Sequence, residues 1–128
     1  MFVPHQSDNG LQPHEYYPAA AGSYKVGQML NLSNGKLTAV VAASTKTPQY
    51  VSMAKKELAD GEILPVLRVT KDMVFETTLS AAADAVAIGS KLQVSAGGLE
   101  VDTAAAGTFE LLQIEGTDIG SVVRGRFH

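Results

Sequence analysis

The sequence contains no cysteine and no tryptophan, and aromatic residues make up only 6% of its 128 residues. The absence of cysteine excludes disulfides, thiolate catalysis and cysteine-ligated zinc. Hydrophobic residues reach 45%, but they are mainly alanine, valine and leucine. Such small and β-branched side chains favour tightly packed sheets over a deep ligand pocket lined with aromatic rings.

Concentrated charge and long hydrophobic runs are also missing. Ten basic and thirteen acidic residues give a net charge of −3 without any basic run, which argues against a nucleic-acid partner. No apolar run approaches the roughly 20 residues that cross a bilayer, and "MFVPHQSDNG" lacks the basic and apolar regions of a secretory signal. We therefore expect a soluble protein made in a cytoplasm, with no membrane partner.

Residues arranged for catalysis or metal binding are not evident in the sequence. No histidine has a partner at metal-ligand spacing, and all three lie in terminal segments: His5, His14 and His128. There is no G-x-S-x-G motif and no phosphate-binding loop. The closest carboxylate pairs are expected near turns or on exposed strand faces: Asp60/Glu62 and Glu100/Asp102. We predict that the protein is not an enzyme and has no cofactor, no metal site and no small-molecule substrate.

Residues 1–15, "MFVPHQSDNGLQPHE", contain two prolines and show no period of 2 or 3.6 residues. This pattern predicts an extended N-terminal arm that does not order within its own domain. Its apolar residues leave two alternatives, a free terminus or an arm that orders against a partner. The candidate contact residues in the arm are Phe2, Val3, Pro4, Leu11 and Pro13.

Residues 16–128 read as a single β-rich domain of about nine or ten short strands separated by turn signals, which is typical of a barrel or sandwich. Asn34-Gly35 lies between two alternating runs and predicts a type I′ hairpin. Pro65 suggests that its strand is bulged or lies at an edge. Residues 80–90, "SAAADAVAIGS", are compatible with either a short helix or a loop with one helical turn.

One pattern occurs twice, as "VGQMLNLSNGKLT" in residues 26–38 and as "IGSKLQVSAGGLE" in residues 88–100, with five identities at thirteen positions. The shared residues are turn glycines and alternating aliphatic residues, which build a hairpin and carry no chemistry. Two copies suggest two-fold pseudosymmetry within one barrel or sandwich. The alternative is that two good hairpins converge on the same residues.

The basic residues nearest one another in the strand-like segments are Arg68, Lys71, Arg124 and Arg126. Arg124 and Arg126 are expected on one face of the last strand, "SVVRGRF". Such a face is either solvated or a contact stripe for an acidic neighbour.

The chain resembles the small capsid decoration (cement) proteins of tailed bacteriophages. The resemblance is carried by the proline-rich arm, the body rich in alanine, glycine, valine and threonine, the repeated units, and the ending "GTDIGSVVRGRF". It implies a structural virion protein on the outer capsid surface that binds the major capsid protein, usually as a homotrimer, and stabilises the head. The family also implies an arm that orders on the capsid.

An alternative remains open, namely another phage structural or host-glycan-binding module from a tail, baseplate or spike. Carbohydrate sites usually present exposed aromatic rings, and the candidates are the four tyrosines: Tyr16, Tyr17, Tyr24 and Tyr50.

Overall fold

The computed structural model describes residues 1–7, 13–40, 46–82, 86–103 and 107–128. These residues form thirteen β-strands and no helix, so no described helix is available to span a membrane. The predicted all-β class is confirmed. The strands are β1 (Val3–Ser7), β2 (Glu15–Pro18), β3 (Gly22–Tyr24), β4 (Met29–Ser33), β5 (Lys36–Ala39), β6 (Tyr50–Ser52), β7 (Lys56–Leu58), β8 (Ile63–Arg68), β9 (Met73–Thr78), β10 (Lys91–Val94), β11 (Val101–Asp102), β12 (Phe109–Ile114) and β13 (Val122–Phe127).

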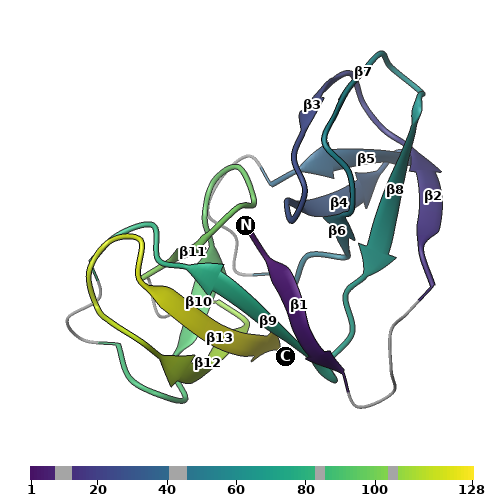
Figure 1. The fold of residues 1–128 in the computed structure, drawn as a ribbon. Helices are drawn as coiled ribbons and strands as arrows, with labels where there is room; N and C mark the ends of the chain where they lie inside the picture. Colours follow the sequence, from purple (N-terminus) through teal and green to yellow (C-terminus); the bar gives the residue numbers. More distant parts are fainter. Residues whose placement is uncertain (8–12, 41–45, 83–85, 104–106) are drawn as a thin grey trace.

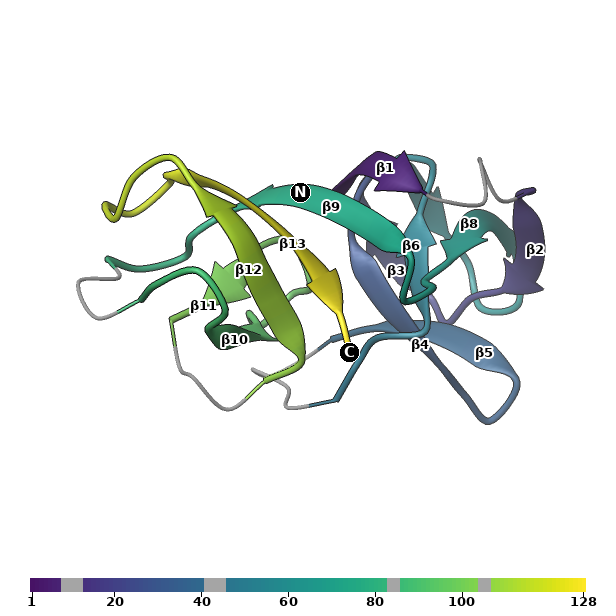
Figure 2. The ribbon, with the colours of Figure 1, turned by 90° about the horizontal axis from the view of Figure 1, so that it is seen from below.

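The described strands form three antiparallel sheets (Figures 1 and 2). The six-stranded sheet has the order β1-β9-β13-β12-β10-β11, the five-stranded sheet has the order β2-β8-β6-β4-β5, and β3 pairs with β7. None of them closes into a barrel, so the barrel prediction is wrong. One isolated parallel bridge in each larger sheet links strands that are not neighbours: Ala19, after β2, with Leu37 of β5, and Leu79, after β9, with Val101 of β11.

The two larger sheets contain the same five-stranded unit. Unit 1 consists of β2, β4, β5, β6 and β8, and unit 2 consists of β9, β10, β11, β12 and β13. In both units the first strand pairs with the fifth, the fifth with the fourth, the fourth with the second and the second with the third. The isolated bridges also occupy equivalent places. The repeat noticed in the sequence therefore belongs to a larger structural repeat, to which β1 and the β3–β7 pair are additions.

Equivalent turns precede the second strand of each unit. The Gly27 N–H donates to the Ser52 carbonyl and the Gly89 N–H to the Leu111 carbonyl, both at 2.8 Å. Each partner returns a bond, from Ser52 N–H to Gln28 O and from Leu111 N–H to Ser90 O. The glycines have φ of 76° and 92°, and a positive φ at the third residue of a turn is typical of type II.

The same turn recurs before the fifth strand of each unit, where the sequence comparison did not detect it. Gly61 donates to Ala19 and Gly120 donates to Leu79, while the N–H groups of Ala19 and Leu79 donate back to the residue after each glycine. The φ angles of Gly61 and Gly120 are 86° and 82°.

The hairpins between the second and third strands differ in their loops. The predicted type I′ turn at Asn34-Gly35 is confirmed, with φ of 51° and 78°, and it joins β4 directly to β5. In unit 2 the loop between β10 and β11 is longer, because Val94 pairs with Val101. Leu99 therefore lies in a loop, whereas its match in the sequence, Leu37, lies in β5.

The helical turn expected in residues 80–90 is absent from the described part of that segment, and residues 83–85 lie outside the described residues. The edge position or bulge expected at Pro65 is wrong. Pro65 is in β8, which lies between β2 and β6 without a register shift. A strand residue directs its N and O to the same side, and the Pro65 carbonyl accepts the N–H of Met53, just past the end of β6. The side of Pro65 that lacks an N–H therefore faces residues just beyond the end of β6, so no hydrogen bond of the β6–β8 pair is lost.

The larger hydrophobic core lies between the two large sheets. It combines the side chains of Met29, Val51 and Leu67 from unit 1 with the buried face of unit 2. A second core covers the other face of unit 1, where Tyr24 and Leu58 of the β3–β7 pair lie against it. Unit 1 is thus covered on both faces and unit 2 on one.

The predicted arm is wrong for residues 1–7. β1 pairs antiparallel with β9, and the Phe2 side chain is only 1% exposed. Its ring centroid lies 5.7 to 6.3 Å from those of the other three phenylalanines in the chain, Phe75, Phe109 and Phe127. A register shift between Pro4 and Gln6 interrupts the strand, which hides its period of two. Leu11 lies outside the described residues.

Candidate binding surface at the junction of the two units

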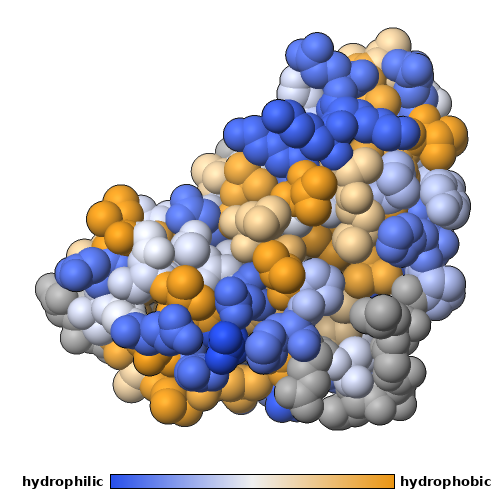
Figure 3. Space-filling model, viewed as in Figure 1, coloured by the Kyte–Doolittle hydropathy of each residue, from blue (hydrophilic) through white to orange (hydrophobic). Residues whose placement is uncertain are grey.

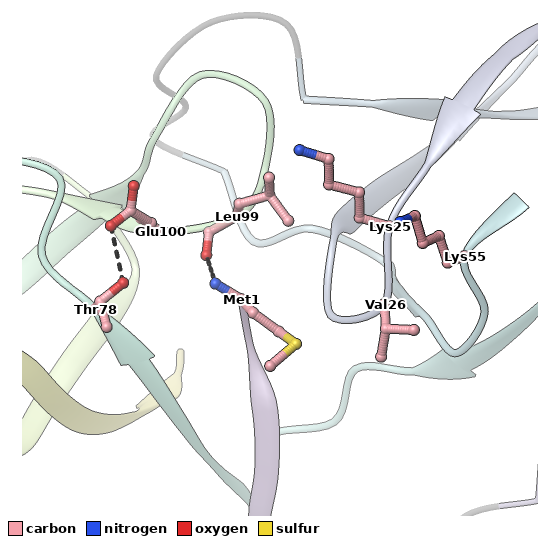
Figure 4. A pocket seen from close by; sticks show the side chains of 7 residues that line it. All are labelled: Met1, Lys25, Val26, Lys55, Thr78, Leu99 and Glu100. Atoms are coloured by element: carbon pink, nitrogen blue, oxygen red, sulfur yellow. Dashed lines mark hydrogen bonds between the residues drawn. The ribbon is translucent and has the colours of Figure 1, made fainter. Parts of the chain in front are cut away.

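A depression of about 450 Å³ opens where unit 1 meets unit 2 (Figure 4). We call it the junction groove. It lies beside the N-terminal residue, at the end of β9 and between the turn before β4 and the β10–β11 loop. It is lined by Met1, Lys25, Val26, Lys55, Thr78, Leu99 and Glu100.

The walls of the junction groove are held together by bonds between the two units. The Gln28 amide donates to the Gly97 carbonyl at 2.8 Å, and the Met29 N–H donates to the Gly98 carbonyl at 2.7 Å. A Cβ at Gly98 would lie 2.5 Å from the Met29 oxygen, so glycine is required for this close approach. The turn of unit 1 and the loop of unit 2 therefore form one rigid edge.

The floor of the groove is apolar. Met1 and Val26 are 51% and 43% exposed, and Leu99 lies beside them (Figure 4). The α-amino group of Met1 donates to the Leu99 carbonyl; burial lowers the pKa of this amine, and the nearby Glu100 partly opposes the shift. Glu100 itself accepts a hydrogen bond from the Thr78 hydroxyl at 2.8 Å.

Cationic side chains border the groove. Lys25 and Lys55 also line an adjoining hollow of about 520 Å³, together with Lys56 and Glu57. Among the described residues, none of these three lysines forms an ion pair. Figure 3 shows hydrophilic side chains gathered over β3 and β7, and hydrophobic surface in the recess below them. The arrangement suits a partner with an apolar side chain next to carboxylates.

The described residues contain no group of three histidine, aspartate or glutamate side chains that could hold a metal ion. His128 is paired with Glu110 at 2.8 Å, while His5 and His14 are exposed. The predictions of no enzymatic activity and no cofactor remain predictions.

The predicted arm contacts are separated by the fold. Phe2 is buried in the core and cannot reach a partner, so its prediction as a contact residue is wrong. Val3 is 42% exposed, Pro4 is half-buried and Pro13 is exposed. Val3 therefore remains the apolar side chain of β1 that a partner can reach.

Arg124 and Arg126 share one face of β13, as expected from the alternating burial of that strand. Arg124 bridges its neighbours, donating to Glu76 at 2.9 Å and to Gln113 at 2.8 Å. Arg126 lies opposite Glu110, and its Nε is buried without a hydrogen-bond partner among the described residues. Arg124 thus ties β13 to both neighbouring strands, and a contact between these arginines and a partner stays a prediction.

Three of the four tyrosines are not available as binding platforms. Tyr24 and Tyr50 are buried at 5% and 4% exposure. The Tyr17 ring packs against Tyr50, and its hydroxyl donates to Glu15 at 2.5 Å. Only Tyr16, 63% exposed, presents its ring, so the structure adds no support for a glycan site built on Tyr16 and Tyr17 together.

The junction groove was not found from the sequence, because its residues come from five separate segments. The available signal was the repeat itself, which contains Val26 in its first copy and Leu99 in its second. No protein-family model matches the chain, and a search of curated proteins finds no significant match.

Proposed function

We propose that the protein is a structural virion protein that binds the outer surface of a tailed-phage capsid and stabilises the head without catalysis. The observation that carries the proposal is the junction groove, where apolar side chains lie beside lysines that have no carboxylate partner among the described residues. Val3, exposed on β1, adds a further apolar contact.

The polar side chains elsewhere support the same interpretation. Arg124 and Arg68 tie neighbouring strands through carboxylates. An all-β body with two shared cores provides a rigid surface, and many copies on a shell add weak contacts through multivalency. Such a protein needs surface complementarity rather than a reaction site.

The test is co-sedimentation with heads assembled from the major capsid protein encoded near this gene. We expect the protein to move with the heads in a gradient and to raise the temperature at which they release DNA or disassemble. Lys55→Glu combined with Lys56→Glu should weaken binding, whereas Lys71→Glu, an exposed charge on the β8–β9 turn, should not.

Wild-type protein that stays at the top of the gradient with these heads would contradict the proposal. Equal weakening by Lys71→Glu would mean that net charge, and not the junction groove, governs binding.

A further inference from the structure

Besides the junction groove, the molecule has a second prominent surface feature, the second turn of unit 2, Asp118 to Ser121. Ile119 in this turn is 71% exposed, the largest exposed fraction among the large hydrophobic side chains of the described residues. Asp118 precedes it and is exposed, whereas Glu115, four residues earlier, lies 4.0 Å from the Arg124 guanidinium. An apolar side chain thus lies next to one accessible carboxylate.

The turn is held in a fixed shape. The Ser121 N–H donates to the Asp118 carbonyl at 3.0 Å, which closes the turn. The Gly120 N–H donates to Leu79 O at 2.8 Å, and the Leu79 N–H donates to Ser121 O at 3.0 Å. Ile119 is therefore presented with little conformational entropy left to lose on binding.

The groove and the turn are complementary in hydrophobicity and in charge. The groove offers Met1, Val26 and Leu99 as an apolar floor and Lys25 and Lys55 as cations, with Lys56 in the adjoining hollow. None of these lysines forms an ion pair among the described residues. Glu100 in the groove and Glu57 in the hollow leave a local excess of one positive charge. The turn offers one protruding isoleucine and the carboxylate of Asp118, whose charge is opposite to that of the lysines; such electrostatic matching selects a partner.

Within one molecule the two surfaces cannot meet. In Figures 1 and 2 the loop between β12 and β13 lies at the outer end of the six-stranded sheet, away from the junction. We propose that the Asp118–Ser121 turn of one copy docks into the junction groove of a second copy. Because the two surfaces differ, the contact is head-to-tail, and it forms a closed ring if the rotation between copies closes.

The chain supplies a matched control. Ile88 is 69% exposed and occupies the equivalent position in the first turn of unit 2, where Gly89 has a φ of 92°. Its neighbour Ala87 carries no charge, unlike Asp118. If docking depends on the second turn, Ile119→Lys should abolish it and Ile88→Lys should not.

The experiment is sedimentation equilibrium of the full chain, with circular dichroism to show that each variant is folded. We expect wild-type protein to self-associate below ~1 mM and Ile119→Lys to raise the dissociation constant at least about tenfold. Lys55→Glu with Lys56→Glu should do the same. Ile88→Lys should leave the constant within about twofold.

Mixing two variants tests the direction of the contact. Asp118→Lys with Ile119→Lys keeps the groove but loses the turn, and Lys55→Glu with Lys56→Glu keeps the turn but loses the groove. Each should be monomeric alone, and together they should form a one-to-one dimer. A wild-type protein that is monomeric up to ~1 mM, equal effects of Ile88→Lys and Ile119→Lys, or no dimer on mixing would overturn the proposal. No capsid is present, so this result is independent of head binding. Since one groove holds only one partner at a time, capsid heads should compete with the docked turn for it.

Discussion

The two five-stranded units have the same strand order and the same turns, but they place opposite kinds of side chain at equivalent positions. In unit 1, Glu15 and Arg68 form an ion pair at 2.8 Å, and Arg68 lies over the Tyr50 ring. The register of the strands puts three phenylalanines at these positions in unit 2: Phe75, Phe127 and Phe109. The difference follows from β1, which brings Phe2 onto unit 2 and has no counterpart in unit 1.

On the opposite face of the two sheets, the apolar side chains belong to unit 1 and the charged side chains belong to unit 2. Across β4, β6 and β8, unit 1 has three apolar residues in one row: Met29, Val51 and Leu67. The same row in unit 2 has three charged residues: Lys91, Glu110 and Arg126. The row of unit 1 is covered by unit 2, whereas the row of unit 2 has no third unit above it. Equivalent backbones therefore take their side-chain character from what covers them.

Exchange of side chains between these two rows should have the largest effect. Leu67, 3% exposed, is equivalent to Arg126, and Leu67→Arg would bury an unpaired charge between the sheets. We expect a loss of more than about 5 kcal/mol in the free energy of unfolding, measured by urea denaturation. The reciprocal Arg126→Leu should change it by less than about 1 kcal/mol. Similar losses from both changes would contradict the comparison.

Removal of the Phe2 ring should have the next largest effect, because only unit 2 uses β1. Phe2→Ala is expected to cost about 3–5 kcal/mol, as for other buried phenylalanines, and thermal or urea unfolding would measure it. Val3→Ala is the control, since Val3 is the next residue, begins β1 and is 42% exposed. A Phe2→Ala protein as stable as wild type would restore the idea of a free arm.

The equivalent turn glycines allow a third, smaller test. Both have positive φ, but a Cβ at Gly27 would lie 2.7 Å from the Phe2 oxygen and 2.9 Å from its nitrogen, while nothing lies within 4 Å of a Cβ at Gly89. Gly89→Ala should cost only the strain of the left-handed backbone, about 1–2 kcal/mol. Gly27→Ala should cost at least about 2 kcal/mol more, because β1 must shift. Equal losses in urea denaturation would show that β1 yields freely.

The sequence was sufficient for the features that depend on neighbouring residues. The all-β class, the Asn34-Gly35 hairpin and the shared face of Arg124 and Arg126 in β13 all follow from local period and turn chemistry. β1 was missed because the register shift after Pro4 breaks its alternation. Half of the structural repeat was also missed, because Gly61 and Gly120 are almost the only residues that mark it.

The junction groove could not be predicted for a different reason. Its walls approach through Gly98 and Met29, which are far apart in the sequence, and nothing local indicates that Lys25 and Lys55 will lie together. Long-range packing also decides which of two equivalent positions is apolar, as Leu67 and Arg126 show. Leu67 and Arg126 count as a mismatch when the two halves of the sequence are compared. The structural repeat is hidden because unit 2 covers this face of unit 1, while the equivalent face of unit 2 is uncovered.

The smallest expected effect on stability comes from Glu15, Arg68 and Tyr50, which stand in unit 1 where unit 2 has phenylalanines, and from Tyr17, which donates to Glu15. The hydrogen bond to Glu15, and after it the interaction with Tyr50, raises the pKa of Tyr17 to about 12. The folded protein thus holds the phenolic proton more tightly than the unfolded chain. This contribution to stability is complete below pH 10, the ordinary value, and is lost as the pH rises to about 12.

Glu15→Gln should therefore lower the pKa of Tyr17 towards its ordinary value, because the charged acceptor is gone. Nuclear magnetic resonance of the Tyr17 ring across an alkaline titration would measure the change, with Tyr17→Phe assigning the signal. The pKa of Glu15 is itself lowered, first by Arg68 and then by Tyr17, so its own contribution is lost as the pH falls through that lowered value. An unchanged Tyr17 titration in Glu15→Gln would show that Tyr50 and burial set the pKa instead, and that the polar group of unit 1 does not act as one network.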